Sequence, residues 1–228
     1  MTAMPTRPRQ LALALEFGES FAREDFLAGP SNAAALALIE RWPDWPAQAV
    51  ALVGPEGSGK SHLAAIWARA AGARSIAGHA IEAAGVPTAL ATGALVVEDL
   101  SEAGCDEYGL FHLLNLAREE GAFVLMTART APAGWKVRLR DLASRLRAMP
   151  AVALAPPDDE LLRAVLVKQF ADRRLAVDEG LIGYLATRIE RSFAALRTAV
   201  AELDREALRQ KRQVNRTLAA ELFRERGG

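Results

Sequence analysis

An eight-residue glycine-rich loop constrains the fold of this chain more than any other feature. Residues 54–61 match the pattern G-x-x-x-x-G-K-[ST], with the apolar run Val50–Val53 before them. Apolar residues then recur at helical spacing from Leu63 to Ala70. A loop of this kind between a strand and a helix binds phosphate, because its backbone N–H groups surround the phosphate oxygens at the positive end of the helix. The alternative is a glycine-rich turn that binds nothing.

The loop also supplies side chains for a nucleotide and its metal ion. Lys60 can reach the β- and γ-phosphates, and the Ser61 hydroxyl can bind Mg²⁺. We therefore expect ADP or ATP with Mg²⁺ as cofactors, and the pattern leaves open which nucleotide is resident. The candidate nucleotide-binding residues are Gly54, Pro55, Glu56, Gly57, Ser58, Gly59, Lys60 and Ser61, together with His62, which follows the loop directly.

Two acids end a second apolar run. Leu95–Val97 is followed by Glu98 and Asp99. An enzyme that hydrolyses nucleotide on such a loop needs an acid at the end of a neighbouring strand, to hold Mg²⁺ and to position the attacking water. We assign Glu98 to the metal and Asp99 to the water, as candidate catalytic residues. The alternative is a pair of solvated acids where a strand ends.

The apolar runs predict an α/β fold. Runs at 50–53, 94–97, 123–126 and 152–154 alternate with helical patterns, which indicates a parallel sheet covered on both faces. After Pro156 and Pro157 the remaining patterns are helical, and Asp158, Asp178 and Ser192 occupy N-cap positions. We predict three parts: a flexible leader at 1–16, a nucleotide-binding base at 17–155 and a small helical lid at 156–228.

Charge and cysteine content exclude several classes of protein. The 28 basic and 28 acidic side chains cancel, so no global field attracts DNA or an acidic membrane. The single cysteine, Cys105, cannot form an internal disulfide, and no cluster of Cys and His has metal-ligand spacing. No apolar run reaches membrane-spanning length. We expect a cytoplasmic protein that does not associate with membranes.

The segment Leu139–Leu146, with the sequence Leu-Arg-Asp-Leu-Ala-Ser-Arg-Leu, resembles the arginine-finger segment of DnaA-type AAA+ proteins. It is most similar to the DnaA-homologous replication regulators, the Hda family. The resemblance implies an AAA+ base domain, with a parallel sheet flanked by helices, and a small all-helical lid. It also implies that Arg145 is the catalytic arginine that one subunit offers to the nucleotide of its neighbour. The alternative is a solvated helix face that carries Arg138, Arg140, Arg145 and Arg147.

Further segments share this resemblance. Phe26–Asn32 is similar to the part of the family that receives the adenine, and Pro156–Asp158 and Leu203–Arg205 also look like Hda. Gln10–Leu15 is similar to the motif by which the family docks on the sliding clamp of the replisome. An extended peptide of this kind places alternate side chains in an apolar cleft, so the partner-binding candidates are Gln10, Leu11, Leu13 and Leu15. The competing interpretation is a first strand, or a hydrophobic arm packed on the base.

Two positions depart from the family pattern. Arg129 stands where DnaA-type sequences usually have an Asp, at the end of the sensor-1 strand. Ala194 aligns with the sensor-2 arginine, while Arg191 and Arg197 lie one helical turn to either side and can reach the same helix face. We include Arg197 among the nucleotide-binding candidates. Both departures predict weak intrinsic ATP hydrolysis.

DnaA-type initiators carry a further helix-turn-helix domain, whereas this chain ends at Gly228 soon after the lid. We therefore expect no direct sequence-specific DNA binding. The basic stretch from Arg205 to Arg216 is either a solvated face or a docking surface.

The leading hypothesis is a regulator of replication initiation that binds ADP or ATP, docks on the clamp and stimulates ATP hydrolysis by DnaA through Arg145. A stand-alone ATPase or loader acting on single-stranded DNA or a helicase remains a rival, as does a non-catalytic clamp adaptor. The expected partners are DnaA and the sliding clamp. The chain could also form a homo-oligomer.

Overall fold

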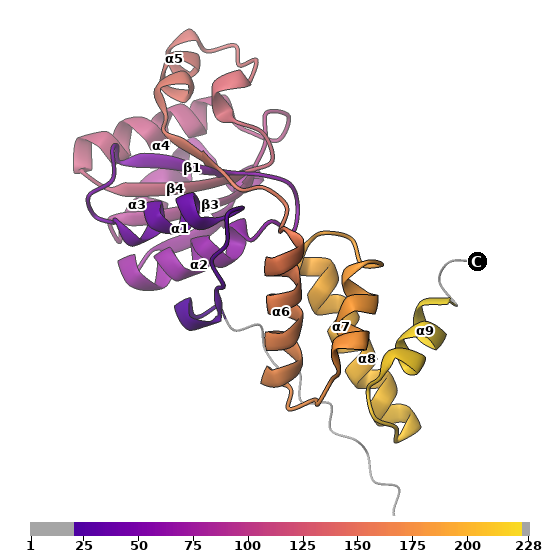
Figure 1. Cartoon of the computed structure of the whole chain (residues 1–228). Helices are drawn as coiled ribbons and strands as arrows, with labels where there is room; N and C mark the ends of the chain where they lie inside the picture. Colours follow the sequence, from indigo (N-terminus) through magenta and orange to yellow (C-terminus); the bar gives the residue numbers. More distant parts are fainter. Residues whose placement is uncertain (1–20, 225–228) are drawn as a thin grey trace, which may run out of the picture.

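The chain folds into a sheet-containing base and a bundle of helices beside it. Figure 1 shows the computed structural model, in which residues 21–224 are described. The sheet has five parallel strands in the order β2-β3-β4-β1-β5. Four of them lie at the predicted runs, and β2 is additional. The strands are β1 (Ala49–Val53), β2 (Arg74–Ala77), β3 (Ala94–Leu100), β4 (Phe123–Ala128) and β5 (Ala151–Ala153).

Helices cover both faces of this sheet because its central strands are apolar on both sides. They are α1 (Ala33–Glu40), α2 (Lys60–Ala71), α3 (Val86–Leu90), α4 (Glu107–Glu120) and α5 (Arg140–Ala148). Short 3₁₀ turns lie at Arg23–Asp25, Gly78–Ala80, Ala83–Gly85 and Pro132–Gly134. The predicted α/β class with a parallel sheet flanked by helices is confirmed.

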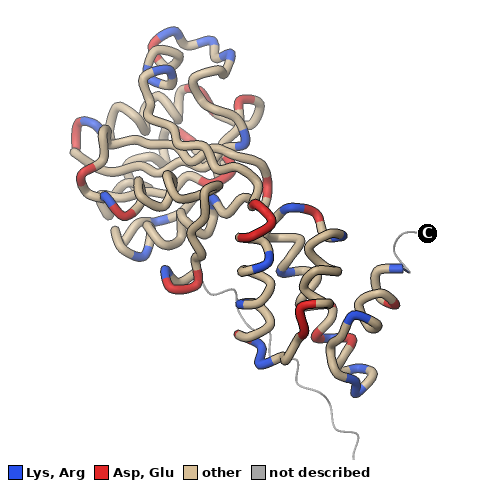
Figure 2. The backbone as a smooth tube through the Cα atoms, in the orientation of Figure 1, with Lys and Arg blue, Asp and Glu red and all other residues tan. Residues whose placement is uncertain are grey.

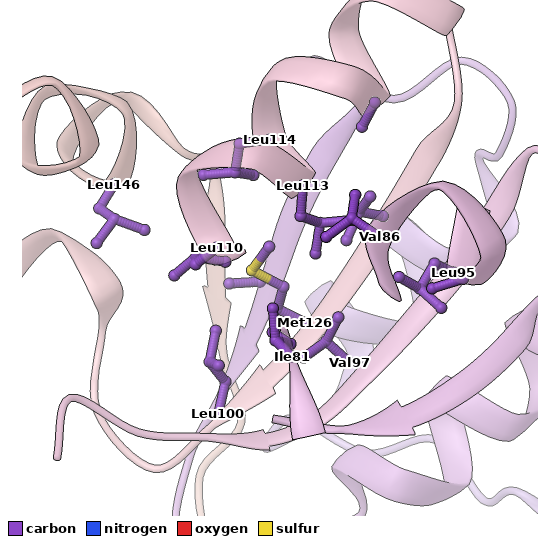
Figure 3. Packing of buried hydrophobic residues seen from close by; sticks show 14 of the residues in the cluster. Ile81, Val86, Leu95, Val97, Leu100, Leu110, Leu113, Leu114, Met126 and Leu146 are labelled. Atoms are coloured by element: carbon purple, nitrogen blue, oxygen red, sulfur yellow. The ribbon is translucent and has the colours of Figure 1, made fainter. Parts of the chain in front are cut away.

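Successive side chains of the inner strands β3 and β4 enter different cores, as the two-residue period of a strand requires. Val97 and Met126 lie in the core beneath α3, α4 and α5 (Figure 3). Val96 and Leu125, one position earlier on the same strands, lie in the core beneath α1 and α2. The sheet is therefore the middle of three layers, and α2, which follows the glycine-rich loop, is fixed to it by buried Leu63 and Trp67.

The lid has a hydrophobic core of its own. Its helices are α6 (Asp159–Asp172), α7 (Glu179–Ala186), α8 (Phe193–Gln210) and α9 (Arg216–Arg224). The three N-caps predicted from the sequence are confirmed: the Asp158, Asp178 and Ser192 side chains accept hydrogen bonds from Leu161 N, Leu181 N and Ala195 N at 2.8, 2.7 and 3.1 Å. Apolar residues of all four helices meet in one cluster.

Because all five strands run parallel, their carboxyl ends lie at one edge of the sheet, where the glycine-rich loop and the acids after β3 meet. The lid lies beside the base at lower right in Figure 1. Charges of both signs are spread over base and lid alike (Figure 2). No helix among residues 21–224 is long and apolar enough to cross a membrane. The division of the chain at 16/17 and 155/156 stays a prediction.

Candidate nucleotide-binding site

The glycine-rich loop has the backbone of a phosphate-binding loop. Gly57 and Gly59 have φ values of 72° and 99°, in the left-handed region that glycine adopts without strain. A Cβ on Gly54 would lie 2.4 Å from the carbonyl oxygen of Leu154, the residue after β5, so the loop packs too closely on this segment for a larger residue. The N-cap residue of α2 is Gly59, which has no side chain to cap the helix, and the positive end of this 12-residue helix adjoins the loop. The buried Ser58 hydroxyl has no hydrogen-bond partner within the described part of the chain.

Lys60 lies inside the loop. Its ammonium donates hydrogen bonds to the carbonyl oxygens of Gly54 and Pro55 at 2.8 and 2.7 Å, and the residue is 6% exposed. Burial lowers the pKa of Lys60; the charge of Arg129 acts in the same direction, while Asp99 and Glu56 oppose it. A partly desolvated ammonium beside carboxylates interacts strongly with an entering phosphate.

A cavity of about 300 Å³ opens over the loop. Lys60, Ser61 and Asp99 lie in its wall on the base side, so the structure brings together the lysine, the hydroxyl predicted to bind the metal and one of the two predicted acids. Of the eight loop residues, Glu56, Gly57, Gly59, Lys60 and Ser61 line the cavity. The lid contributes Phe193, Ala194 and Arg197.

The two acids after β3 are placed differently. Asp99 lines the cavity, whereas Glu98 is absent from its lining residues. The pairing of β3 with β4 shifts between Val97 and Leu100, and Asp99 has a φ of 52° in this irregular segment. The Asp99 N–H donates to the buried Thr127 hydroxyl at 3.0 Å, which holds the turn. This placement favours Asp99 as the acid nearest the phosphates, while our division of roles stays a prediction.

The lid closes one side of the cavity by direct contact with the loop. The Phe193 N–H at the start of α8 donates to the Gly57 carbonyl at 2.8 Å. A Cβ on Gly57 would lie only 2.5 Å from the Ser192 Cβ. Arg197 projects from the same helix to the cavity. Arg191, the other candidate for the sensor-2 position, forms an ion pair with Asp159 at 2.7 Å and is not among the lining residues.

His62 lies at the junction of the cavity and a smaller slot of about 50 Å³. One ring nitrogen is 3.2 Å from the Ala22 carbonyl oxygen, and the Phe26 ring meets the imidazole edge-on at 5.2 Å between centroids. Phe26 and Leu27, the start of the segment expected to receive the adenine, line the slot with Val165 of the lid. Asp25, Gly59, Phe193 and Arg197 complete its lining, so the slot combines aromatic rings with charged side chains. His62 therefore lines both the cavity and the slot, which its position in the sequence did not reveal.

Arg145 lies away from this cavity. Its guanidinium stands over the Phe111 ring at 5.4 Å from the centroid, and it lines a separate cavity of about 230 Å³. Helix α4 also fixes the start of α5, since the Glu107 carboxylate accepts hydrogen bonds from Arg138 N and Leu139 N, each at 2.9 Å to Oε2. These backbone hydrogen bonds lower the pKa of Glu107. Helix α4 thus contacts the segment at the start of α5 and the Arg145 side chain itself.

Sequence reasoning missed two contacts of the site. The Arg129 guanidinium donates to the Glu56 carboxylate at 2.6 Å across the cavity wall, and Ser192 packs on Gly57. The departure of Arg129 from the family pattern was the one signal for the first contact. Gln10, Leu11, Leu13 and Leu15, the clamp-binding candidates, lie outside the described residues.

Among curated proteins, the chain is similar to replication initiators. It is 25% identical over 230 residues to chromosomal replication initiator protein DnaA 2 of Chlamydia caviae, covering 88% of this chain and 48% of the relative. It is 25% identical over 206 residues to DnaA 1 of Chlamydia muridarum, covering 78% of this chain and 45% of that relative. The chain thus spans about half the length of the curated relatives it matches. No protein-family model matches it.

Superposition on solved structures identifies the fold. Domain III of DnaA from Thermotoga maritima superposes with a TM-score of 0.71 at 19% identity, covering 90% of this chain and 96% of that one. The chain has the DnaA-like AAA+ fold. The RuvB branch migration motor of the same organism also superposes, with a TM-score of 0.70 at 16% identity, over 89% of this chain and 70% of RuvB. The glycine-rich loop, β3 and the lid are therefore parts of an AAA+ fold.

A further DnaA structure is of a protein bound to AMPPCP and single-stranded DNA. It superposes with a TM-score of 0.65 at 16% identity, covering 84% of this chain and 68% of that one. Similarity at this level shows the fold. The activity and partners of the whole initiator belong to that protein.

Proposed function

We propose that this chain is a regulator of replication initiation that binds ADP or ATP and offers Arg145 to the nucleotide of a neighbouring DnaA subunit. In this proposal it acts in the cytoplasm and docks on the sliding clamp through Gln10–Leu15. The similarity to DnaA over most of the chain supports the link to replication initiation. The resemblance to the Hda family is our reason to propose a regulatory role, with DnaA and the sliding clamp as partners.

One observation carries the proposal, namely the separation of two arginines. Arg197 lines the chain's own cavity together with Lys60, whereas Arg145 lies outside it, on a helix held by α4. An arginine that completes a neighbour's site must lie on a different surface from the site of its own subunit. This separation supports the proposal that Arg145 acts in trans and that the chain's own cavity is reserved for its own nucleotide.

The residues of the cavity fit an adenine nucleotide with Mg²⁺. The loop glycines admit a close backbone approach, the α2 amino terminus and Lys60 supply positive charge, and the adjoining slot offers aromatic rings to adenine. Mg²⁺ is held in such sites by one or two protein oxygens plus phosphates and water, and Ser61 with Asp99 provides that donor set. Because Asp99 lines the cavity and Glu98 does not, we now propose Asp99 for the metal, in place of the Glu98 that the sequence suggested. The ion would neutralise charge on the β- and γ-phosphates.

The stand-alone ATPase is the second candidate, because Asp99 lies in the same cavity wall as Lys60 and could serve hydrolysis by this chain itself. One DnaA structure with the same fold is bound to single-stranded DNA. If the chain is a stand-alone ATPase, single-stranded DNA is therefore a candidate partner. A chain that hydrolyses its own ATP without stimulating DnaA would favour it.

The test is single-turnover hydrolysis of ATP preloaded on DnaA, with and without clamp loaded on DNA. Wild type should accelerate hydrolysis, and Arg145→Ala should abolish the effect, because an arginine in trans contributes a factor of about 10³ to 10⁵ in phosphoryl transfer. Arg145→Lys should rescue poorly, because an ammonium lacks the planar geometry of guanidinium. Arg147→Ala, an exposed arginine on the same helix, is the matched control and should act like wild type.

A truncated chain that starts at Glu16 separates clamp docking from catalysis. It should lose clamp association and clamp-dependent stimulation while still binding nucleotide. Equal stimulation of DnaA by wild type, Arg145→Ala and Arg145→Lys would show that Arg145 is not the finger.

A further inference from the structure

Three arginines of the lid gather around one side of α7. Helix α7 contacts both α6 and α9, and Figure 1 shows it between them. Arg163 belongs to α6, Arg188 follows the end of α7, and Arg216 begins α9. All three residues are exposed, and none of them lines the nucleotide cavity or its adjoining slot. They therefore belong to a surface separate from the nucleotide site.

Tyr184 of α7 positions two of these arginines. The guanidinium carbon of Arg188 lies 4.1 Å from the centre of the Tyr184 ring, and that of Arg216 lies at 5.7 Å. Arg163 reaches the preceding residue, because a Cβ on Gly183 would lie 3.7 and 4.0 Å from its two terminal nitrogens. A cation–π contact holds a guanidinium at the ring while its N–H groups can still donate to an anion. We call Arg163, Tyr184, Arg188 and Arg216 the α7 arginine face.

The charge of this face is not compensated by acids. Within the described part of the chain, none of its three arginines forms an ion pair with a carboxylate. Other arginines of the lid do, since Arg209 pairs with Glu206 and Arg212 pairs with Glu221. The basic stretch from Arg205 to Arg216 is thus partly neutralised, whereas its last residue joins the α7 arginine face. Like charges that gather on a surface repel one another, and an anion that enters among them relieves this repulsion.

The surroundings of the face favour a short acidic segment of a protein over a nucleic acid. Glu179 at the start of α7 and Glu190 beyond its end are both exposed, so negative charge bounds the face along the helix. The phosphates of a long nucleic acid would meet these acids too, and the chain has no net charge to compensate for them. The Arg188 guanidinium also occupies the Tyr184 ring, on which a base would stack. Carboxylates, in contrast, fit the planar fork of arginine.

We propose that the α7 arginine face binds an acidic segment of a partner protein, whose Asp and Glu carboxylates accept hydrogen bonds from Arg163, Arg188 and Arg216. This docking function goes beyond the proposed action of Arg145 and does not depend on nucleotide binding. It gives the lid two different surfaces. One is the start of α8, which contacts the glycine-rich loop, and the other is the side of α7 that receives the partner.

The experiment titrates the full chain into a fluorescein-labelled poly-glutamate peptide, and separately into a labelled oligothymidylate of equal charge, and follows fluorescence anisotropy. Wild type should bind the peptide, and more tightly than the oligothymidylate. Arg163→Gln, Arg188→Gln and Arg216→Gln should each raise the Kd for the peptide about 3- to 10-fold, because each removes a charge-assisted hydrogen bond. The triple variant should lose binding. All these arginines are exposed, so the variants should keep the Tm of wild type.

Two further variants test the arrangement of the face. Tyr184→Phe keeps the ring that positions Arg188 and Arg216, so it should bind the peptide like wild type. Tyr184→Ala should raise the Kd about as much as the loss of one arginine. Arg209→Gln is the matched control, because it makes the same charge change at an exposed lid arginine that already pairs with Glu206. It should leave the Kd within about twofold of wild type.

Three results would overturn the proposal. One is a wild-type chain that does not bind the peptide, and another is a triple variant that binds it as tightly as wild type. The third is tighter binding of the oligothymidylate with the same loss in the triple variant, which would make the face a nucleic-acid site. None of these results bears on stimulation of DnaA through Arg145, so the two proposals fail separately.

Discussion

The contact between the lid and the glycine-rich loop predicts that one small substitution, Gly57→Ala, destabilises the fold more than loss of the glycine backbone conformation alone would. The new Cβ would lie 2.5 Å from the Ser192 Cβ, at a residue whose φ is 72°. The left-handed backbone alone costs an alanine about 1–2 kcal/mol. Relief of the clash requires α8 to move away, which breaks the 2.8 Å hydrogen bond from Phe193 N to Gly57 O. The loss of that bond adds about 0.5–1.5 kcal/mol.

Together these terms destabilise the fold by about 1.5–3.5 kcal/mol, which corresponds to a fall in Tm of about 3–14 °C for a chain of this size. The assay is thermal unfolding followed by circular dichroism without nucleotide. Gly72→Ala is the matched control, because Gly72 also has a positive φ, of 62°, but a Cβ there meets nothing within 4 Å. Gly72→Ala should therefore destabilise the fold only by about 1–2 kcal/mol, which is what the left-handed backbone costs an alanine.

A second substitution should restore part of the loss. Ser192→Gly removes the clashing Cβ, and glycine replaces serine as an N-cap at a cost of only a few tenths of a kcal/mol. The double variant Gly57→Ala/Ser192→Gly should therefore melt above Gly57→Ala alone. Equal falls in Tm for Gly57→Ala and Gly72→Ala, with no recovery in the double variant, would refute the contact between lid and loop.

Two further predictions concern the acids. Asp99→Asn should reduce the Mg²⁺ dependence of ADP affinity more than Glu98→Gln does, measured by titration with and without Mg²⁺, because Asp99 lines the cavity; the reverse order would return the metal to Glu98. Glu107→Gln should lower stability near neutral pH, because the folded-state pKa of Glu107 is depressed below its ordinary value of 4.5. A depressed carboxyl stabilises the fold above its unfolded pKa and loses that effect as pH falls through the folded value. The gap in urea midpoint between wild type and Glu107→Gln should therefore narrow as pH falls below about 4.5, and a gap independent of pH would contradict this account.

Apolar runs were sufficient to predict four strands, because the inner strands of a parallel sheet are buried on both faces. The missed strand, β2, shows why the rule fails at an edge. Arg74 and Ser75 make half of its four residues, both are exposed, and β2 pairs with β3 alone. Such a segment has neither an apolar run nor a clear alternation. In the lid, helical periodicity and N-cap residues together predicted helices, which the structure has at α6 to α9.

Local pattern was sufficient to predict a glycine-rich loop from Gly54 to Ser61 between a strand and a helix, and nucleotide binding by that loop stays a prediction. The site was not predictable where tertiary geometry decides. The irregular pairing after Val97 places Asp99 in the cavity wall, and no spacing rule encodes that shift. The Arg129–Glu56 pair joins segments 73 residues apart, which only the parallel order of β1 and β4 brings together.

The central claim is that the cavity over the phosphate loop binds adenine nucleotide, and ligand-induced stabilisation tests it most directly. Wild type should melt higher with ADP or ATP and Mg²⁺, because bound ligand contributes about 2.7 kcal/mol at a hundredfold excess over Kd. For a chain of this size that is a rise of about 5–11 °C. Lys60→Ala should lose most of the rise, and Lys136→Ala, an exposed lysine outside the cavity, should keep it. A wild-type melting curve unmoved by saturating ADP and ATP would contradict the account.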